Sequence, residues 1–285
     1  MAQVGIYEKA LPQGISWEER LKLAKDLGFD FIEMSIDETD ERLSRLDMSM
    51  NEIDDIRNKS NELGIRINSI CLSGHRRYPF GSSNTHKRDK AKMLLEKAII
   101  FAHRLGVPII QIAGYDVYYE DKSMLSRERF IEGMRDGVKL ASQYGVILSI
   151  EIMDDPFMNS IQKFLEIKEQ IPSPYLQVYP DLGNLSAWLT NNPGYELELG
   201  IDSITSIHLK DTFPVTNDFS GQFRDVPFGE GCVDFSGLLC TLYRLGYDGT
   251  FLIEMWSEKS DQFINEINEA KNYLYPKMRE AGYNV

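Results

Sequence analysis

Apolar, strand-like runs alternate along the chain with charged stretches that have the period of an amphipathic helix. The apolar runs predict strands near residues 3–7, 30–36, 65–71, 108–113, 146–153, 176–181, 204–210 and 249–255. The stretches between them predict helices near residues 16–27, 49–63, 87–105, 127–144, 160–170, 193–199, 234–245 and 260–281. Eight strands in strict alternation with eight helices are typical of a closed parallel α/β barrel, the (β/α)8 or TIM barrel. We expect it to form a single domain over residues 1–285. An open doubly wound sheet fits less well, because no Gly-x-Gly-x-x-Gly motif follows the first strand.

The predicted helices carry recognisable start and stop signals. Ser16 with Glu19 three residues later has the pattern of a capping box, and Ser126 and Asp234 are candidate N-caps. Glycine fits the left-handed conformation that often follows a helix end. Six predicted helices end in such a glycine, in Leu-Gly at 27–28, 63–64, 105–106, 199–200 and 245–246 and in Tyr-Gly at 144–145.

Four predicted strands end in a side chain that can bind a metal ion: Glu151, Asp181, His208 and Glu254. Their separations are 30, 27 and 46 residues, which match one strand–helix unit each, with an extra loop in the last. The C-terminal ends of barrel strands meet at one mouth, so three carboxylates and one imidazole should converge there. This donor set suits a divalent cation such as Mn²⁺ or Zn²⁺.

Lys210 and Arg224 are candidate substrate contacts near this mouth. Side chains alternate along a strand, so Lys210 should share a face with His208. It either contacts a substrate or forms an ion pair with Asp211 or another acid. Arg224 lies in the long loop 212–233 and is either an exposed surface residue or part of a lid that excludes water.

The densest basic cluster near a predicted mouth loop is His75, Arg76 and Arg77, within loop 72–86. In an acidic chain it suggests an anion site suited to phosphate, and the alternative is a solvated run of charges. Tyr115, which follows the fourth strand, either packs against the barrel rim or lines a sugar pocket. No Walker motif occurs, which argues against a nucleoside triphosphate.

The metal-capable residues also suit proton transfer. A cation bound to a ketone oxygen and its neighbouring hydroxyl acidifies the carbon between them. One glutamate can then remove that proton, and a second on the opposite face can return one, which inverts the centre. Glu151 and Glu254 lie on separate predicted strands and suit this geometry. No Gly-x-Ser-x-Gly motif occurs, so nucleophilic hydrolysis is a poor interpretation.

Composition narrows the class of partner. The net charge of -13 argues against nucleic acid or an anionic membrane as a partner. The first five residues lack the basic start and apolar stretch of a signal peptide, and no apolar run approaches the ~20 residues of a membrane span. The 3 cysteines form no Cys-x-x-Cys motif. We therefore expect a cytoplasmic protein with free thiols.

Seven stretches resemble the L-ribulose-5-phosphate 3-epimerases, also called L-xylulose-5-phosphate 3-epimerases, of the xylose-isomerase-like barrel superfamily. They are residues 4–12, 71–82, 151–154, 179–188, 207–212, 221–231 and 252–256, which include Ile-His-Leu-Lys-Asp-Thr and Gly-Gln-Phe-Arg-Asp-Val-Pro-Phe-Gly-Glu-Gly. The resemblance spans nearly the whole chain, and the long motifs are specific to this family. The four isolated metal-capable residues alone would specify only the superfamily.

The resemblance implies an isomerase that interconverts L-ribulose 5-phosphate and L-xylulose 5-phosphate through a cis-enediolate, in the breakdown of L-ascorbate or related pentoses. It implies metal ligation by Glu151, Asp181, His208 and Glu254, with Glu151 and Glu254 as the acid–base pair. The phosphate of such a substrate gives the basic cluster at 75–77 a purpose. We expect a homo-oligomer, with a dimer as the first choice.

Two positions depart from related 3-epimerases that act on free ketoses. Those enzymes use a histidine three residues after the aspartate ligand, where Asn184 stands here, and a glutamate where this chain has Phe157 and Met158. We therefore expect Asn184 to contact the substrate differently. The alternatives are another sugar isomerase or free-ketose 3-epimerase on the same metal site, a metal-dependent nuclease, and a non-catalytic sugar-binding barrel.

Overall fold

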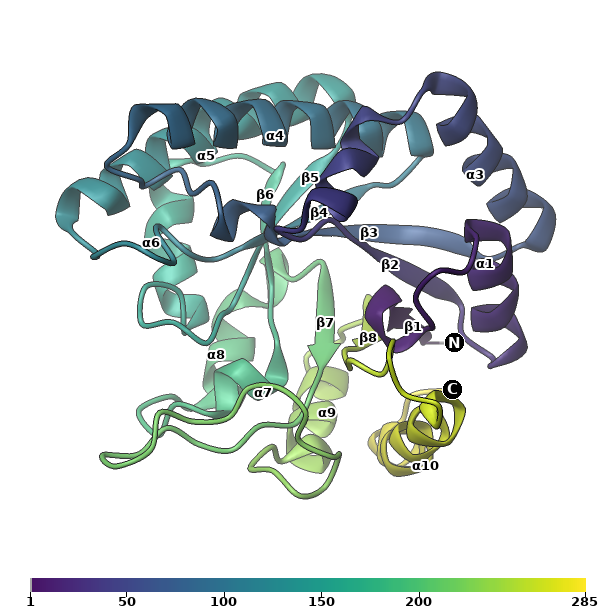
Figure 1. The fold of residues 1–285 in the computed structure, drawn as a ribbon. Coiled ribbons are helices and arrows are strands. Elements are labelled where there is room, and N and C mark those ends of the chain that lie inside the picture. The colour runs from purple at the N-terminus through teal and green to yellow at the C-terminus, as the bar shows by residue number, and fades with distance from the viewer. Residues whose placement is uncertain (1) are drawn as a thin grey trace.

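The computed structural model describes residues 2–285, and their strands form one parallel sheet that closes into a barrel (Figure 1). The strand order is β6-β5-β4-β3-β2-β1-β8-β7. The strands are β1 (Gln3–Tyr7), β2 (Phe31–Ser35), β3 (Arg66–Leu72), β4 (Ile109–Ala113), β5 (Ile147–Glu151), β6 (Leu176–Tyr179), β7 (Ser206–Leu209) and β8 (Thr250–Ile253). Parallel bridges from Val178 to Ile204 and from Asp181 to His208 join the two sheet ends. The predicted TIM barrel is therefore confirmed.

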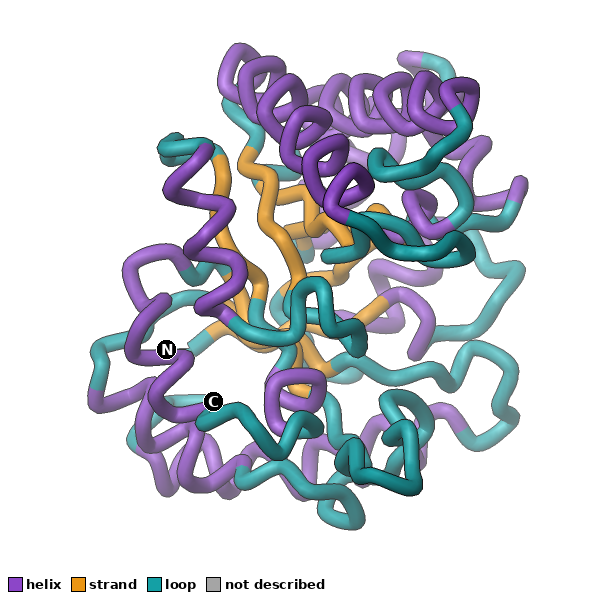
Figure 2. The backbone as a smooth tube through the Cα atoms, turned by 90° about the vertical axis from the view of Figure 1, so that its left-hand side faces the viewer, coloured by secondary structure: helices purple, strands orange, loops and turns teal. Residues whose placement is uncertain are grey.

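Helices surround the barrel (Figures 1 and 2). The longer ones are α1 (Trp17–Asp26), α3 (Met50–Leu63), α4 (Thr85–Leu105), α5 (Met124–Tyr144), α6 (Ile161–Gln170), α8 (Pro193–Gly200), α9 (Phe235–Arg244) and α10 (Phe263–Ala281). The boundaries of all these helices and of the strands lie within three residues of the predicted ones. Short helices α2 (Asp40–Leu43) and α7 (Leu182–Ser186) and four 3-10 turns, η1 (Glu8–Ala10), η2 (Ser44–Asp47), η3 (Ser73–Arg76) and η4 (Ile201–Ser203), were not predicted. No helix within residues 2–285 is long and apolar enough to cross a membrane.

The start signals of the helices are confirmed in two of three cases. Ser16 and Glu19 form the predicted capping box of α1, and Asp234 caps α9. The prediction for Ser126 was wrong, because α5 begins one turn earlier with Ser123 as its N-cap. Ser126 lies at the third helical position, where its side chain accepts a hydrogen bond from the Ser123 backbone N–H. Two serines at this spacing allow either assignment from sequence.

Most of the predicted glycine stops also hold. Five of the six glycines have positive φ angles, between 67° and 82°: Gly28, Gly64, Gly106, Gly145 and Gly246. Gly200 is the exception, with a φ of -98°, because the chain continues from α8 directly into the 3-10 turn η4. That helix therefore ends without a left-handed residue.

The apolar core divides into one large region and smaller clusters. The larger fills the space between the strands and the outer helices. A smaller cluster of Tyr7, Phe31, Cys71 and Leu252 lies apart from it, on β1, β2, β3 and β8. A Cβ atom at Gly5 would lie 2.2 Å from Phe31 Cε2, so only glycine leaves room for this ring. The fully buried Phe31 therefore depends on its glycine neighbour in the adjacent strand.

A network of buried charges fixes the loops after β1 and β2. Arg45 donates to the fully buried Glu8 over 2.7 Å, and Arg42 Nη1 lies 2.9 Å from the same carboxylate. Burial raises the pKa of Glu8, but the arginines outweigh this effect and lower it overall. Lys9 donates to Asp37 over 2.5 Å. Burial also opposes ionisation of Asp37, yet its hydrogen bonds, that from Lys9 foremost, bring its pKa to about 2.

Candidate metal centre and active site

The four predicted metal ligands converge at the C-terminal mouth of the barrel. The parallel bridge between Asp181 and His208 places these two residues side by side. Glu151 is the last residue of β5, and Glu254 directly follows β8. One ligand atom from each of the four residues lies within 4.8 Å of all the others. All four residues are buried, and none is more than 6% exposed. The four residues that the sequence spacing predicted to converge therefore form one cluster.

The atoms of this cluster suit a cation. His208 Nδ1 lies 3.1 Å from Glu151 Oε1, 3.7 Å from Glu254 Oε2 and 3.9 Å from Asp181 Oδ2. The last two oxygens are buried, and both lie within 3.0 Å of the Lys210 ammonium. Buried carboxylate oxygens are costly unless a cation compensates them. Three carboxylates and an imidazole therefore fit a divalent metal ion such as Zn²⁺ or Mn²⁺.

Three buried polar residues that sequence reasoning missed hold this cluster in place. Glu33 Oε1 lies 3.0 Å from His208 Nε2, and Ser69 donates to Glu33 Oε2 over 2.6 Å. Gln111 donates from Nε2 to Glu151 Oε2. A partner on the second ring nitrogen orients a ligating histidine and fixes its tautomer. A polar residue inside an otherwise apolar strand was the available signal, as in Phe-Ile-Glu-Met-Ser and Ile-Ile-Gln-Ile-Ala.

Lys210 adds a buried positive charge to the same cluster. Its Nζ lies 2.6 Å from Asp181 Oδ2 and 3.0 Å from Glu254 Oε2, and 5.6 Å from the centre of the Trp256 ring. The ion pair with a mouth acid is thus present, but its partner is not Asp211. That carboxylate instead accepts hydrogen bonds from backbone N–H groups in the loop after β7, among them Gly229. Asp211 therefore shapes the loop that carries Arg224.

The electrostatic environment gives the carboxyl groups of the cluster different pKa values. Burial raises the pKa of Glu151 despite its contact with His208, and burial raises the pKa of Asp181 to about 7 against the attraction of Lys210. Burial opposes ionisation of Glu254 too, but Lys210 and His208 outweigh it and lower its pKa to about 2. Burial disfavours the cationic form of His208, yet Glu33 and Glu254 raise its pKa. Carboxyl groups with separated pKa values are typical of an acid–base pair.

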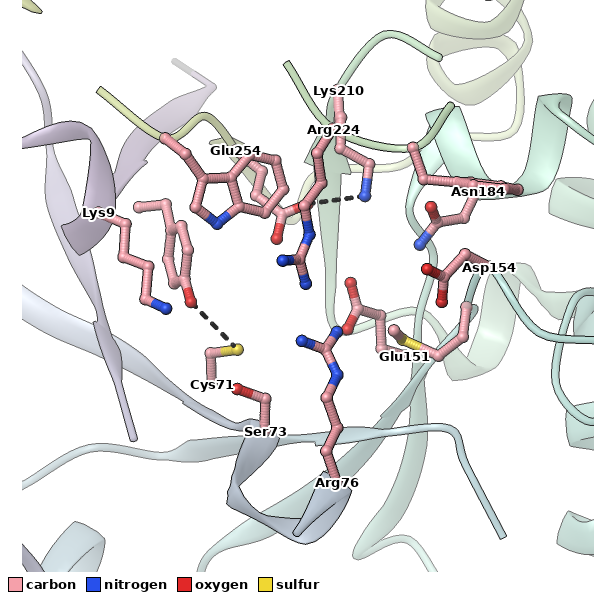
Figure 3. A pocket seen from close by; sticks show the side chains of 14 residues that line it. Lys9, Cys71, Ser73, Arg76, Glu151, Asp154, Asn184, Lys210, Arg224 and Glu254 are labelled. Atoms are coloured by element: carbon pink, nitrogen blue, oxygen red, sulfur yellow. Dashed lines mark hydrogen bonds and ion pairs between the residues drawn. The ribbon is translucent and has the colours of Figure 1, made fainter. Parts of the chain in front are cut away.

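A narrow cavity of about 30 Å³ lies over the cluster (Figure 3). It is lined by Tyr7, Lys9, Cys71, Ser73, Arg76, Glu151, Met153, Asp154, Asn184, Lys210, Phe223, Arg224, Glu254 and Trp256. Four of these residues, Lys9, Arg76, Lys210 and Arg224, are basic. The cavity therefore combines a carboxylate-rich floor with positive charge suited to an anionic substrate.

The structure separates the three basic residues that we predicted would act together. Arg76 lines the cavity, and its guanidinium points toward that of Arg224 in Figure 3. His75 does not line it: the imidazole is buried against Phe80, and burial lowers its pKa to about 4, so it is neutral near pH 7. Arg77 is also outside the lining and pairs with Asp40 at 2.6 Å. Of the three residues predicted to bind an anion together, only Arg76 therefore lines the cavity.

Tyr115 supports Arg76 and is itself absent from the cavity lining. The Arg76 guanidinium lies 5.3 Å from the centres of the Tyr115 and Tyr118 rings. Tyr115 donates its hydroxyl hydrogen to Asp154, and Arg76 Nη2 lies 3.4 Å from the same hydroxyl oxygen. Burial raises the pKa of Tyr115 well above its ordinary value, so the phenol stays protonated. Of the two predicted interpretations, packing at the rim describes Tyr115.

Asn184 and Arg224 both line the cavity. Asn184 donates to the Ile152 carbonyl over 2.9 Å, while its Oδ1 is buried without a hydrogen-bond donor from residues 2–285. Arg224 stacks 5.1 Å above the Trp256 ring. The residue after it, Asp225, has a φ of 57°, the single positive value outside glycine in the described chain. The side chains of Asn184 and Arg224 therefore present polar groups to the cavity.

Known proteins share this fold and sequence. A family model described as xylose isomerase-like TIM barrel matches residues 21–276. A protein of Escherichia coli (strain K12), "Putative L-ribulose-5-phosphate 3-epimerase SgbU", is 54% identical over 281 residues, which cover 99% of this chain and 98% of that protein. "L-ribulose-5-phosphate 3-epimerase UlaE" of Escherichia coli O157:H7 (strain EC4115 / EHEC) is 49% identical, with 98% and 96% covered. A solved L-ribulose 3-epimerase, 18% identical with 99% and 96% covered, has a TM-score of 0.78 and shows the fold alone.

The chain therefore belongs to the xylose isomerase-like TIM barrel family, in the group of carbohydrate epimerases named L-ribulose-5-phosphate 3-epimerases. This confirms the resemblance found in the sequence motifs. The matches cover nearly the full length of this chain and of both relatives, so they are not limited to one part of the barrel.

Proposed function

We propose that the protein is a metal-dependent 3-epimerase that interconverts L-ribulose 5-phosphate and L-xylulose 5-phosphate. The observation that carries the proposal is the pair of glutamates, Glu151 and Glu254, which both line the cavity in Figure 3 and belong to the cluster with Asp181 and His208. The names of the 54% and 49% identical relatives supply the substrate. The same proposal includes a single-domain, cytoplasmic homodimer that acts in L-ascorbate or pentose catabolism.

Glu151, Asp181, His208 and Glu254 would hold the divalent cation, which as a Lewis acid would acidify the C3–H bond beside the ketose carbonyl. Glu254, one of the two cluster glutamates that line the cavity, suits removal of the C3 proton. The resulting sugar cis-enediolate is planar at C3. Glu151, whose pKa is raised, suits delivery of a proton to the other face, which inverts the centre. In the reverse reaction the two glutamates exchange roles.

The basic residues of the cavity would bind the anionic end and the hydroxyl groups of the sugar. Arg76 is partly buried and its Nε has no hydrogen-bond partner among residues 2–285, so it is held ready to bind an anion such as phosphate. Arg224, on the loop after β7, suits a contact from above, and Lys210 and Asn184 suit contacts near the metal ligands. The role that we predicted for His75 and Arg77 does not enter this proposal.

Removal and return of the metal tests this function. Chelation should abolish interconversion of L-ribulose 5-phosphate and L-xylulose 5-phosphate, and Mn²⁺ or Zn²⁺ should restore it. The enzyme should also favour L-xylulose 5-phosphate over free L-xylulose by about tenfold or more, since a charge-assisted contact contributes roughly 1.5–3 kcal/mol. Full turnover by a verified metal-free preparation would refute the metal role. Equal turnover of the free sugar would favour a free-ketose 3-epimerase.

A further inference from the structure

The ammonium group of Lys210 lies inside the ligand cluster and contacts two of its oxygens. Its Nζ is 2.6 Å from Asp181 Oδ2 and 3.0 Å from Glu254 Oε2. The same two oxygens face His208 Nδ1, at 3.9 and 3.7 Å. They are therefore turned toward the centre of the cluster, where a metal ion would bind. Lys210 is buried, with 6% of its surface exposed, so water does not screen these contacts.

A metal ion and this ammonium group would use the same oxygens. Metal–oxygen bonds are short, about 2.0–2.2 Å for Zn²⁺, so a bound ion would lie close to any ammonium left on these carboxylates. Like charges in a buried site repel strongly. In the other direction, loss of both cations would leave the three buried carboxylates of Asp181, Glu254 and Glu151 with His208 as their one remaining compensating partner among the cluster residues. One cation or the other is therefore needed at these oxygens.

We propose that Lys210 is a tethered cation that keeps the metal-free cluster in its folded geometry, and that metal binding displaces its ammonium from Asp181 and Glu254 into the substrate cavity. The inference rests on the proposed metal-dependent function and deepens it. It makes Lys210 a positioning residue in the metal-free protein and a substrate contact in the metal-loaded one.

The surroundings of Lys210 give its side chain room for this movement. Lys210 borders the cavity over the cluster and also a second cavity of about 440 Å³, which lies between the loop after β7 and α10. The Trp256 ring, shared by both cavities, lies 5.6 Å from Lys210 Nζ and offers a face for a displaced ammonium. Lys210 and Arg224 both lie near this ring, the latter at 5.1 Å from its centre, and both line the cavity in Figure 3.

The proposal predicts a specific pattern of metal affinity and stability for Lys210→Met. A metal ion no longer has to displace an ammonium in this variant, so its affinity for Mn²⁺ should rise by about tenfold or more, the equivalent of one lost charge-assisted contact. The chelator-treated variant should melt at a lower temperature than the chelator-treated wild type, and saturating Mn²⁺ should narrow that gap. Lys9→Met is the matched control, because Lys9 lines the same cavity but pairs with Asp37. Its Mn²⁺ affinity should stay within about twofold of wild type.

Calorimetric titration of chelator-treated protein with Mn²⁺, without substrate, measures these affinities. Unchanged or weaker binding by Lys210→Met would overturn the inference and leave the metal site standing. No binding by the wild type would overturn both. A crystal structure of the Mn²⁺-loaded wild type provides a test that needs no variant. The inference predicts that Lys210 Nζ has left both carboxylates, and retention of both contacts beside the bound ion would overturn it.

Discussion

Replacement of Glu33 should weaken metal binding although Glu33 is not itself one of the four ligands. Its carboxylate lies 3.0 Å from His208 Nε2 and is itself held by Ser69 over 2.6 Å. Glu33→Ala removes the group that fixes the imidazole and leaves a buried ring nitrogen without a partner. Loss of such a supporting contact generally weakens metal binding by about 10- to 100-fold, or roughly 1.4–2.7 kcal/mol.

A series of variants at this contact separates orientation from charge. Glu33→Gln keeps the shape and one hydrogen bond but loses the negative charge. A charge-assisted hydrogen bond exceeds a neutral one by about 1 kcal/mol, so the loss should be roughly fivefold. Ser69→Ala leaves the contact between Glu33 and His208 in place and should cost less than Glu33→Ala. Both positions are fully buried, which makes Ser69→Ala a control for general damage to the barrel interior.

Calorimetric titration of chelator-treated variants with Mn²⁺ gives these ratios directly, with circular dichroism to confirm folding. The expected order of affinity is wild type, Ser69→Ala or Glu33→Gln, then Glu33→Ala. A folded Glu33→Ala variant with wild-type affinity would refute the idea that Glu33 orients His208. An equal loss in Ser69→Ala and Glu33→Ala would assign the effect to packing.

Three further predictions follow from the site and its surroundings. Arg76→Ala should weaken binding of the phosphorylated sugar about tenfold or more, whereas Arg77→Ala should change it less than twofold, as substrate titration can show. Metal-loaded Glu151→Gln and Glu254→Gln should both fail to epimerise but exchange the C3 proton of opposite epimers with D2O; exchange of the same epimer by both would indicate a single base. Asp37→Asn should lower the free energy of unfolding by roughly 2 kcal/mol at pH 7. Because the pKa of Asp37 is lowered from 3.8 to about 2, urea unfolding should show this difference shrinking as the pH falls through that range.

The ligand cluster could be predicted because barrel topology converts spacing into proximity. Each ligand follows or ends a strand, and parallel strands in a closed barrel have their C-terminal ends at one mouth. Asp181 and His208 are 27 residues apart in sequence and yet form a bridge between neighbouring segments. No knowledge of side-chain conformation was needed for that step. The helix ends followed in the same way from local rules for serine and glycine.

The partners of these residues could not be predicted, because they depend on side-chain direction and on distant strands. Glu33 meets His208 across 175 residues, and no local pattern links the two. The separation of His75, Arg76 and Arg77 could not be predicted for a related reason. Residues 73–76 form a 3-10 turn, in which successive side chains point about 120° apart. Neighbours in sequence such as His75, Arg76 and Arg77 therefore reach a buried pocket, the cavity and the surface, respectively.

The most direct test of the central claim is the fate of the C3 proton during turnover. L-Xylulose 5-phosphate should be incubated in D2O with Mn²⁺-loaded wild-type protein and followed by NMR, with chelator-treated protein as the control. We predict that L-ribulose 5-phosphate forms with deuterium at C3, and that the chelated protein yields neither product nor exchange. Formation of L-ribulose 5-phosphate with the original C3 proton retained, or deuterated product in the verified absence of metal, would contradict the metal-dependent two-base mechanism.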